Sequence, residues 1–176
     1  MDDQLRSKVI HFFQKSETNI VHMSKEYKID ELLNILPTYL KAEVTYHLFK
    51  DAINVVKVFQ DKDQRFYGEY LSKFQPMRII ANTCFCEEGQ LPKEVYFLLQ
   101  GSVMKGSKLN KVVGAQNSYL IEGSIFGETD LLKNRMRTES YTTVTDCYLL
   151  RIGKTLFKEV LNEFEDFREE INAISH

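Results

Sequence analysis

The placement of glycine divides this 176-residue chain into three zones. Seven of its eight glycines lie between Gly89 and Gly153, and only Gly68 lies outside that stretch. Glycine is costly inside helices and frequent in tight turns. Two glycine-poor zones around a turn-rich middle therefore predict a helical segment, then a β segment, then a second helical segment.

Hydrophobic spacing agrees with this division. Apolar residues recur three and four positions apart over 5–74, which predicts several short amphipathic helices. Asp30 is suited to cap a helix over 31–36, and Pro37 suits the first turn of the next helix. The same helical spacing returns over 156–174.

The N-terminal zone carries more apolar side chains than a thin helical layer can bury. Phe66, Tyr67, Tyr70 and Phe74 have helical spacing, which is typical of core packing. The apolar stripe over 32–40 is expected to face another subunit in part.

The middle zone predicts a sandwich or jelly roll of short strands. Its runs of valine, isoleucine and aromatic residues are bounded by glycine or asparagine. The expected strands are 78–80, 84–86, 95–100, 102–105, 111–116, 141–144 and 147–152.

Composition argues against several classes of protein. The net charge is -2, which does not suit a nucleic-acid partner, and 43% apolar residues are enough for a core. The chain has no long apolar run and no basic-then-apolar signal pattern, so it is expected to be soluble.

The residues of common catalytic and metal sites are missing from the β zone. No histidine lies there, which argues against a metal-dependent cupin, and neither a nucleophile elbow nor a Walker loop occurs. We therefore do not expect an enzyme. Cys84, Cys86 and Cys147 form no disulfide framework and are expected to be buried thiols, the first two on one face of a strand.

The clearest sign of a ligand site lies over 126–139. Phe126 and Gly127 open a stretch in which Glu128 and Arg137 stand nine residues apart. A glycine allows close main-chain approach, the free N–H groups of a following helical turn attract anions, and arginine makes a forked contact with phosphate. With a glutamate to accept from a hydroxyl group, the pattern suits a sugar phosphate.

This stretch resembles the phosphate-binding cassette of the cyclic-nucleotide-binding domain family, which reads approximately Phe-Gly-Glu, a short apolar helix, then Arg-Thr/Ala-Ala. Glu88-Gly89 and the apolar run over 95–103 are similar to the family's Glu-Gly turn and following strand. The family's Pro-Gly-Asp turn is replaced by Ala81-Asn82-Thr83, where asparagine tolerates positive φ. The runs over 147–152 and 157–161 look like the family's last strand and first C-terminal helix.

Further upstream, Leu36-Pro37-Thr38-Tyr39-Leu40-Lys41-Ala42-Glu43-Val44 resembles the C-linker of voltage-gated and cyclic-nucleotide-gated cation channels. The resemblance implies an α+β fold with a helical C-linker over 1–75 and a cyclic-nucleotide-binding domain over 76–176. Within that domain it implies an antiparallel, jelly-roll-like β-roll over 76–152 and C-terminal helices over 153–176.

The resemblance also implies a function. The chain would be a regulatory module of a potassium or mixed-cation channel, at the cytoplasmic face of a membrane, with the transmembrane pore outside this segment. Cyclic AMP or cyclic GMP would bind in the β-roll and act on the pore through C-linker helices that assemble a homotetramer. No cofactor is expected, and the ion conducted, the voltage dependence and the preferred nucleotide stay open.

By position in the cassette, Arg137 is expected to hold the cyclic phosphate and Glu128 the ribose 2′-hydroxyl. The main-chain N–H groups of Gly127 and Thr138 would add phosphate bonds, and the Thr138 hydroxyl could reach a guanine amino group. The expected ligand-binding residues are Phe126, Gly127, Glu128, Asp130, Arg137, Thr138 and Glu139.

Two residues depart from the family pattern. Asp130 replaces a small neutral residue and Glu139 replaces alanine. If both face inward as anions, each like-charge contact with the phosphate costs on the order of 1 to 4 kcal/mol, which Lys133 and Arg135 would offset. Either acid could instead occupy the phosphate site itself, leaving a nucleotide-free structural module.

Two other readings stay open. Glu128 and Arg137 could neutralise one another within a turn. A kinase regulatory subunit would share the roll, but no Arg-Arg-x-Ser segment precedes it here.

Overall fold

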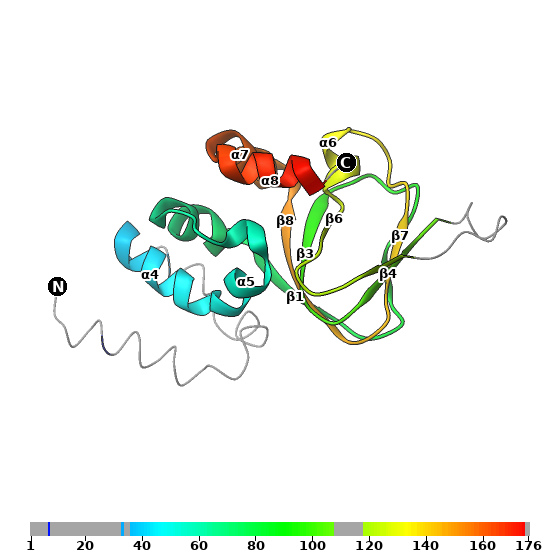
Figure 1. The fold of residues 1–176 in the computed structure, drawn as a ribbon, viewed down its shortest axis with the longest axis horizontal. Helices are drawn as coiled ribbons and strands as arrows, with labels where there is room; N and C mark the ends of the chain where they lie inside the picture. The colour runs from blue at the N-terminus through cyan, green and yellow to red at the C-terminus, as the bar shows by residue number, and fades with distance from the viewer. Residues whose placement is uncertain (1–6, 8–32, 34–35, 108–117, 175–176) are drawn as a thin grey trace.

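The computed structural model describes residues 7, 33, 36–107 and 118–174, apart from the side chain of Thr38. Its helices pack beside a β-roll (Figure 1). The expected helices before residue 33, the Asp30 cap and the expected strand over 111–116 lie outside the described residues.

The β-roll consists of two antiparallel four-stranded sheets, with strand orders β1-β8-β3-β6 and β2-β7-β4-β5. The antiparallel roll is therefore confirmed, and each expected strand among the described residues is present. The pattern missed β5 and β6, which are only three and two residues long. The strands are β1 Gln75–Ile79, β2 Cys84–Cys86, β3 Glu94–Gln100, β4 Val103–Gly106, β5 Ser118–Leu120, β6 Ile125–Phe126, β7 Ser140–Thr143 and β8 Cys147–Gly153.

Helices precede and follow the roll, as the three zones predict. Pro37 directly precedes α4, where a residue without an N–H group costs no helical hydrogen bond. The C-terminal zone forms two helices because the backbone of Phe164 is extended. The helices are α4 Thr38–Leu48, α5 Lys50–Val55, the 3₁₀ turns η1 Lys57–Phe59 and η3 Leu71–Lys73, the π-helical turn η2 Phe66–Tyr70, and α6 Glu128–Leu132, α7 Lys154–Glu163 and α8 Glu165–Ile174.

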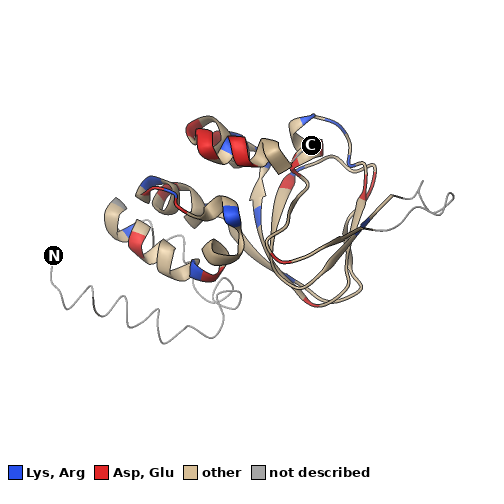
Figure 2. Cartoon of the chain, in the orientation of Figure 1, with Lys and Arg blue, Asp and Glu red and all other residues tan. Residues whose placement is uncertain are grey.

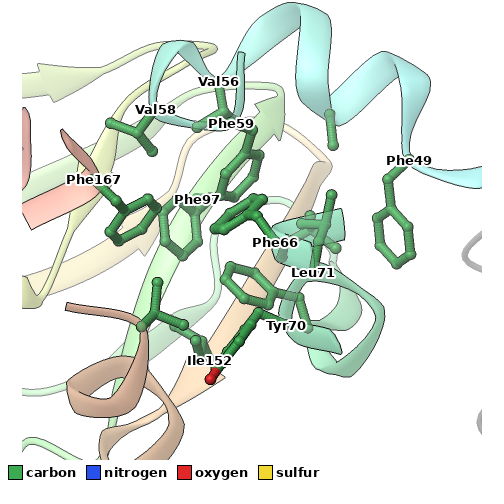
Figure 3. Packing of buried hydrophobic residues seen from close by; sticks show 14 of the residues in the cluster. Phe49, Val56, Val58, Phe59, Phe66, Tyr70, Leu71, Phe97, Ile152 and Phe167 are labelled. Atoms are coloured by element: carbon green, nitrogen blue, oxygen red, sulfur yellow. The ribbon is translucent and has the colours of Figure 1, made fainter. Parts of the chain in front are cut away.

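The larger hydrophobic core lies between the helices and one face of the β1-β8-β3-β6 sheet. Phe97 of β3 meets the ring of Phe59 at 4.8 Å between centroids, and Phe66 packs against both Phe59 and Phe167 (Figure 3). The expected aromatic group is confirmed as core packing, since all four of its side chains are buried. Burial of such rings is the main force that holds the helices on the roll.

The interior of the roll forms a second core on the opposite face of that sheet. Tyr96 and Leu98 alternate along β3 with Val95 and Phe97, which face the helices. The strand is therefore apolar on both faces, and a continuous apolar run results. Phe126 stacks on Tyr96 inside the roll with 5.4 Å between ring centroids.

The cysteine expectation is wrong for one residue of three. Cys86 and Cys147 are buried, but Cys84 is exposed. The register of β2 against β7 shifts between Cys84 and Cys86. Such a bulge breaks the two-residue alternation of side chains, so the two thiols do not share an environment. The turn at Asn82 is as expected, with φ of 59°.

Lys62 connects the N-terminal helical layer, which consists of α4, α5 and the turns η1 to η3, to α8 through ion pairs. Its side chain is only 3% exposed, and its ammonium lies 2.5 Å from Asp166 Oδ2 and 3.0 Å from Glu170 Oε1. Figure 2 colours several residues of α7 and α8 red as aspartate or glutamate. Burial raises the pKa of Asp166, but the hydrogen bond and charge of the Lys62 ammonium, together with main-chain N–H groups that include that of Phe167, outweigh burial and hold the pKa below its usual range.

Replacing Lys62 with methionine should lower the melting temperature at pH 7 by about 3 °C, because roughly 1 kcal/mol of charged hydrogen bonding is lost. A lowered pKa in the folded state stabilises the protein above the ordinary carboxyl pKa and stops doing so as the pH falls through the folded value. The difference between wild type and Lys62→Met should therefore shrink below about pH 4. Thermal melts across pH 2 to 8 measure this.

The exposed Lys57 offers a matched control, and Lys57→Met should melt within about 1 °C of wild type. An equal loss in Lys62→Met at pH 3 and pH 7 would contradict the proposed ion pair.

Candidate functional site

The stretch that was expected to bind a ligand runs from β6 through α6 to the start of β7. Gly127 turns the chain from β6 into α6 with φ of 86°. A Cβ atom at this position would lie 2.7 Å from Nη1 of Arg137. The turn therefore needs glycine both for its backbone conformation and for the close approach of the arginine.

A cavity of about 420 Å³ opens beside this turn, and we call it the cassette cavity. It falls in the size range of small-molecule sites. The cassette, strands β4, β5 and β7 and the end of α8 surround it, with Leu120 and Tyr141 as apolar wall and Ile174 from α8. Of the expected ligand-binding residues, six border it: Phe126, Gly127, Glu128, Asp130, Thr138 and Glu139.

Arg137, the seventh expected residue, does not border the cassette cavity. Its guanidinium donates to the main-chain carbonyls of Gly127 and Glu94, and the residue is only 3% exposed. It borders a separate cavity of about 490 Å³ with Cys86 and Tyr96. In this structure Arg137 joins the cassette to β3.

Asp130 lies in α6, within the segment that was expected to bind a phosphate. It is 3% exposed, and its Oδ1 lies 2.8 Å from Nε of Arg135. The N–H group of Thr138 donates to Oδ2 at 3.2 Å, and the Thr138 hydroxyl donates to Oδ1 at 3.1 Å. The carboxylate thus accepts from the same Thr138 N–H group that was expected to bind phosphate.

The other two acidic residues of the cavity differ in their surroundings. Glu128 is 5% exposed and accepts a hydrogen bond from the Thr129 hydroxyl at 2.8 Å. Glu139 is paired with Lys105 Nζ at 2.8 Å, and both residues border the cavity. Three acidic and three basic residues border the cavity: Glu128, Asp130, Glu139, Lys105, Lys133 and Arg135.

The hydroxyl of Tyr141 is a neutral donor at physiological pH. Burial raises its pKa, and the charge of Glu139 adds to the rise. A buried carboxylate, a neutral phenol and an apolar wall together suit a ligand that carries both hydroxyl groups and a flat apolar part.

Sequence reasoning missed six residues that border the cavity: Lys105, Leu120, Ile125, Thr129, Tyr141 and Ile174. Lys105 and Tyr141 lie on expected strands and are register partners in β4 and β7. Alternation along each strand could have paired their faces, but nothing in the sequence sets the register between strands. Ile174 reaches the cavity only through the packing of α8, for which local sequence carries no signal.

Other kinds of site find no support among the residues described. No group of three or more histidine, cysteine, aspartate or glutamate side chains there could hold a metal ion. In the same part of the chain, no helix combines the length and the apolar character required to cross a membrane.

Gly127→Ala should destabilise the fold by about 2 to 3 kcal/mol, from backbone strain at positive φ and from displacement of the Arg137 guanidinium. Gly89→Ala is the matched control, because Gly89 also has φ of 86° but its added Cβ would meet no atom within 4 Å. It should cost only about 1 kcal/mol. Denaturant unfolding measures both, and equal losses would argue against the close Gly127–Arg137 approach.

Comparison with known protein families gives a match over residues 77–164 to the family described as cyclic nucleotide-binding domain. Relatives extend the likeness over 94% of the chain. A cyclic nucleotide-gated channel of Caenorhabditis elegans is 28% identical over 172 residues, and the human cyclic nucleotide-gated channel alpha-3 is 25% identical over 173 residues. This chain spans only 22% and 24% of the length of those two channels.

Two solved structures share the fold at low sequence identity. One, described as Sp-2Cl-cAMPS bound to PKAR CBD2, has a TM-score of 0.60 at 18% identity, covering 73% of this chain and 85% of that one. The other is the regulatory subunit of a cAMP-independent protein kinase A from Trypanosoma brucei, with a TM-score of 0.64 at 12% identity, covering 77% and 47%.

Proposed function

Because the chain belongs to the cyclic nucleotide-binding domain family, we propose that it is a regulatory module whose cassette cavity binds cyclic AMP or cyclic GMP. The observation that carries the proposal is Glu128, a carboxylate buried to 95% that borders a cavity of small-molecule size. Such a carboxylate is a strong acceptor for the ribose 2′-hydroxyl.

The remaining contacts follow from the shape of the cavity. Leu120, Tyr141 and Ile174 supply apolar surface against which a purine ring can pack. Thr138 and its neighbours supply donors on the side where the phosphate would lie. Cyclic nucleotides are the ligand class of this family. The acidic and basic residues of the cavity walls are equal in number, so the walls neither attract nor repel an anionic nucleotide strongly.

We further propose that the chain is the cytoplasmic regulatory part of a potassium or mixed-cation channel subunit. Support comes from relatives that are cyclic nucleotide-gated channels and that match across 94% of the chain, including the N-terminal helices. In this proposal the C-linker occupies 1–75, forms the homotetramer and meets the pore, and the binding domain occupies 76–176.

The contacts between the two layers suggest how a ligand would act on the pore. Ile174 borders the cavity, while Asp166 and Glu170 of the same helix bind Lys62 of the helical layer. Movement of α8 on binding would therefore pull on the layer that carries α4 and α5. The ligand can shift the arrangement only by its differential affinity for the two states.

A second candidate function is a nucleotide-free assembly module. Asp130 favours it, because its carboxylate already accepts from Thr138 where a ligand phosphate was expected. In that case the Asp130 carboxylate would permanently take the place of the ligand phosphate. The helical layer would then serve only to assemble subunits.

Calorimetric titration with cyclic AMP and cyclic GMP, up to millimolar ligand, distinguishes the two candidates. Glu128→Gln should weaken nucleotide binding about tenfold or more, because a charged hydrogen bond to the ribose is lost. The exposed Glu159 on α7 gives a matched control, and Glu159→Gln should bind like wild type.

Melting temperature provides the second readout, since any ligand that prefers the folded state must raise it. Absence of heat and of a melting shift with both nucleotides would leave the assembly module as the function.

A further inference from the structure

We propose that Lys105 and Glu139 recognise the base of the bound nucleotide, and that together they make the cassette cavity select guanine over adenine. The inference rests on the proposed function and adds to it the preferred ligand, cyclic GMP. It is carried by an ion pair on the wall of the cavity, beside the apolar surface against which a purine ring would pack.

Lys105 is a charged residue on a strand face that points into the roll. Val103 and Lys105 stand two positions apart in β4, so their side chains leave the same face of the sheet. Val103 belongs to the core inside the roll, and so does Tyr141, the register partner of Lys105 in β7. A lysine therefore occupies a position at which the alternation along the strand calls for an apolar side chain.

The Glu139 carboxylate is the partner of this lysine. Its Oε2 lies 2.8 Å from Lys105 Nζ, and the two side chains are 28% and 34% exposed. Both residues border the cavity, so a ligand there can reach both charges. Because the pair is neutral as a whole, Glu139 repels the phosphate of a nucleotide less than an isolated carboxylate would.

Tyr141 relates the ion pair to the rest of the proposed site. Burial raises the pKa of its hydroxyl, and the charges of Glu139 and Glu128 raise it further, so the ring lies within electrostatic range of both carboxylates. In the proposed function Glu128 accepts from the ribose and the purine ring packs on Tyr141. A nucleotide bound in that way turns one edge of its ring toward Lys105 and Glu139.

The ion pair complements the Watson–Crick edge of guanine. Lys105 offers a donor, and beside it the Glu139 carboxylate offers two acceptors. Guanine presents an acceptor, O6, followed by two donors, its N1–H and N2–H groups, so all three positions can be paired. Adenine presents one donor and one acceptor on the same edge, so it leaves one oxygen of the carboxylate unpaired. A two-bond contact with a charged group is also stronger than a single bond.

The experiment is calorimetric titration of the 176-residue chain with cyclic GMP, cyclic AMP and cyclic IMP. Wild type should bind cyclic GMP about tenfold or more tightly than cyclic AMP, which is the discrimination expected of a matched two-bond contact. Cyclic IMP keeps the O6 and N1–H groups of guanine but has no 2-amino group. Its affinity should therefore lie between those of the other two nucleotides.

Glu139→Gln should reduce the preference for cyclic GMP over cyclic AMP to less than about threefold, because the amide places a donor opposite a donor of guanine. Lys105→Met should weaken cyclic GMP and cyclic IMP, which carry O6, more than cyclic AMP. The matched controls are Glu159→Gln and Lys158→Met, since both residues are exposed on α7, and both variants should keep the wild-type preference. Melting curves establish that every variant is folded.

The Thr138 hydroxyl is the other group that was expected to reach the 2-amino group of guanine. In the structure this hydroxyl donates to Asp130 Oδ1 at 3.1 Å. Thr138→Val should therefore change cyclic GMP and cyclic IMP affinity alike. If the difference between these two nucleotides disappears in Thr138→Val and persists in Glu139→Gln, the assignment to Glu139 is overturned.

The remaining outcomes separate the inference from the proposed function. If wild type binds both cyclic GMP and cyclic AMP but prefers cyclic GMP by less than about threefold, or prefers cyclic AMP, the inference is overturned and the proposed function stands. A wild-type preference that Glu139→Gln leaves intact also overturns the inference alone. If wild type binds none of the three nucleotides, the proposed function fails and the inference fails with it.

Discussion

The hydrogen bonds between Asp130 and the two donor groups of Thr138 are the interaction on which the account of this cavity depends. They close the turn between α6 and β7, and with Arg135 they keep the Asp130 carboxylate buried at the edge of the cassette cavity. A buried carboxylate is tolerated only when it is well bonded, and these donors supply that bonding.

Two sets of contacts connect the cassette and its cavity to the helical layer. Arg137 fastens it to β3 through Glu94, and the opposite face of β3 carries Phe97, which packs on Phe59 of the helical layer. A second connection runs through α8, with Ile174 beside the cavity and Lys62 bonded to acidic residues of the same helix. Packed protein cores resist gradual deformation, but they can switch between discrete arrangements. Two rigid connections between the cavity and the helical layer therefore suit a regulatory domain.

Local patterns in the sequence predicted much of the fold because the relevant physics is local. Glycine placement separated the zones, and Asn82 takes the positive φ that its turn requires. The two-residue strand β6 was missed because alternation needs a longer run, and the bulge beside Cys84 was missed because pairing register is not local. For the cavity, the sequence pointed to a segment that does border it but not to the direction of Arg137, which is set by the carbonyls of Gly127 and Glu94. The sequence left open whether Asp130 or Glu139 would occupy the expected phosphate site, and in the structure Asp130 accepts from Thr138 whereas Glu139 pairs with Lys105.

A pair of crystal structures, one without ligand and one grown with cyclic AMP, tests the central claim most directly. The account predicts the Asp130 carboxylate on the Thr138 N–H group in the free protein, and in the complex a nucleotide in the cassette cavity with its ribose 2′-hydroxyl on Glu128. A complex in which the nucleotide lies outside the cassette cavity, or makes no contact with Glu128, would contradict it.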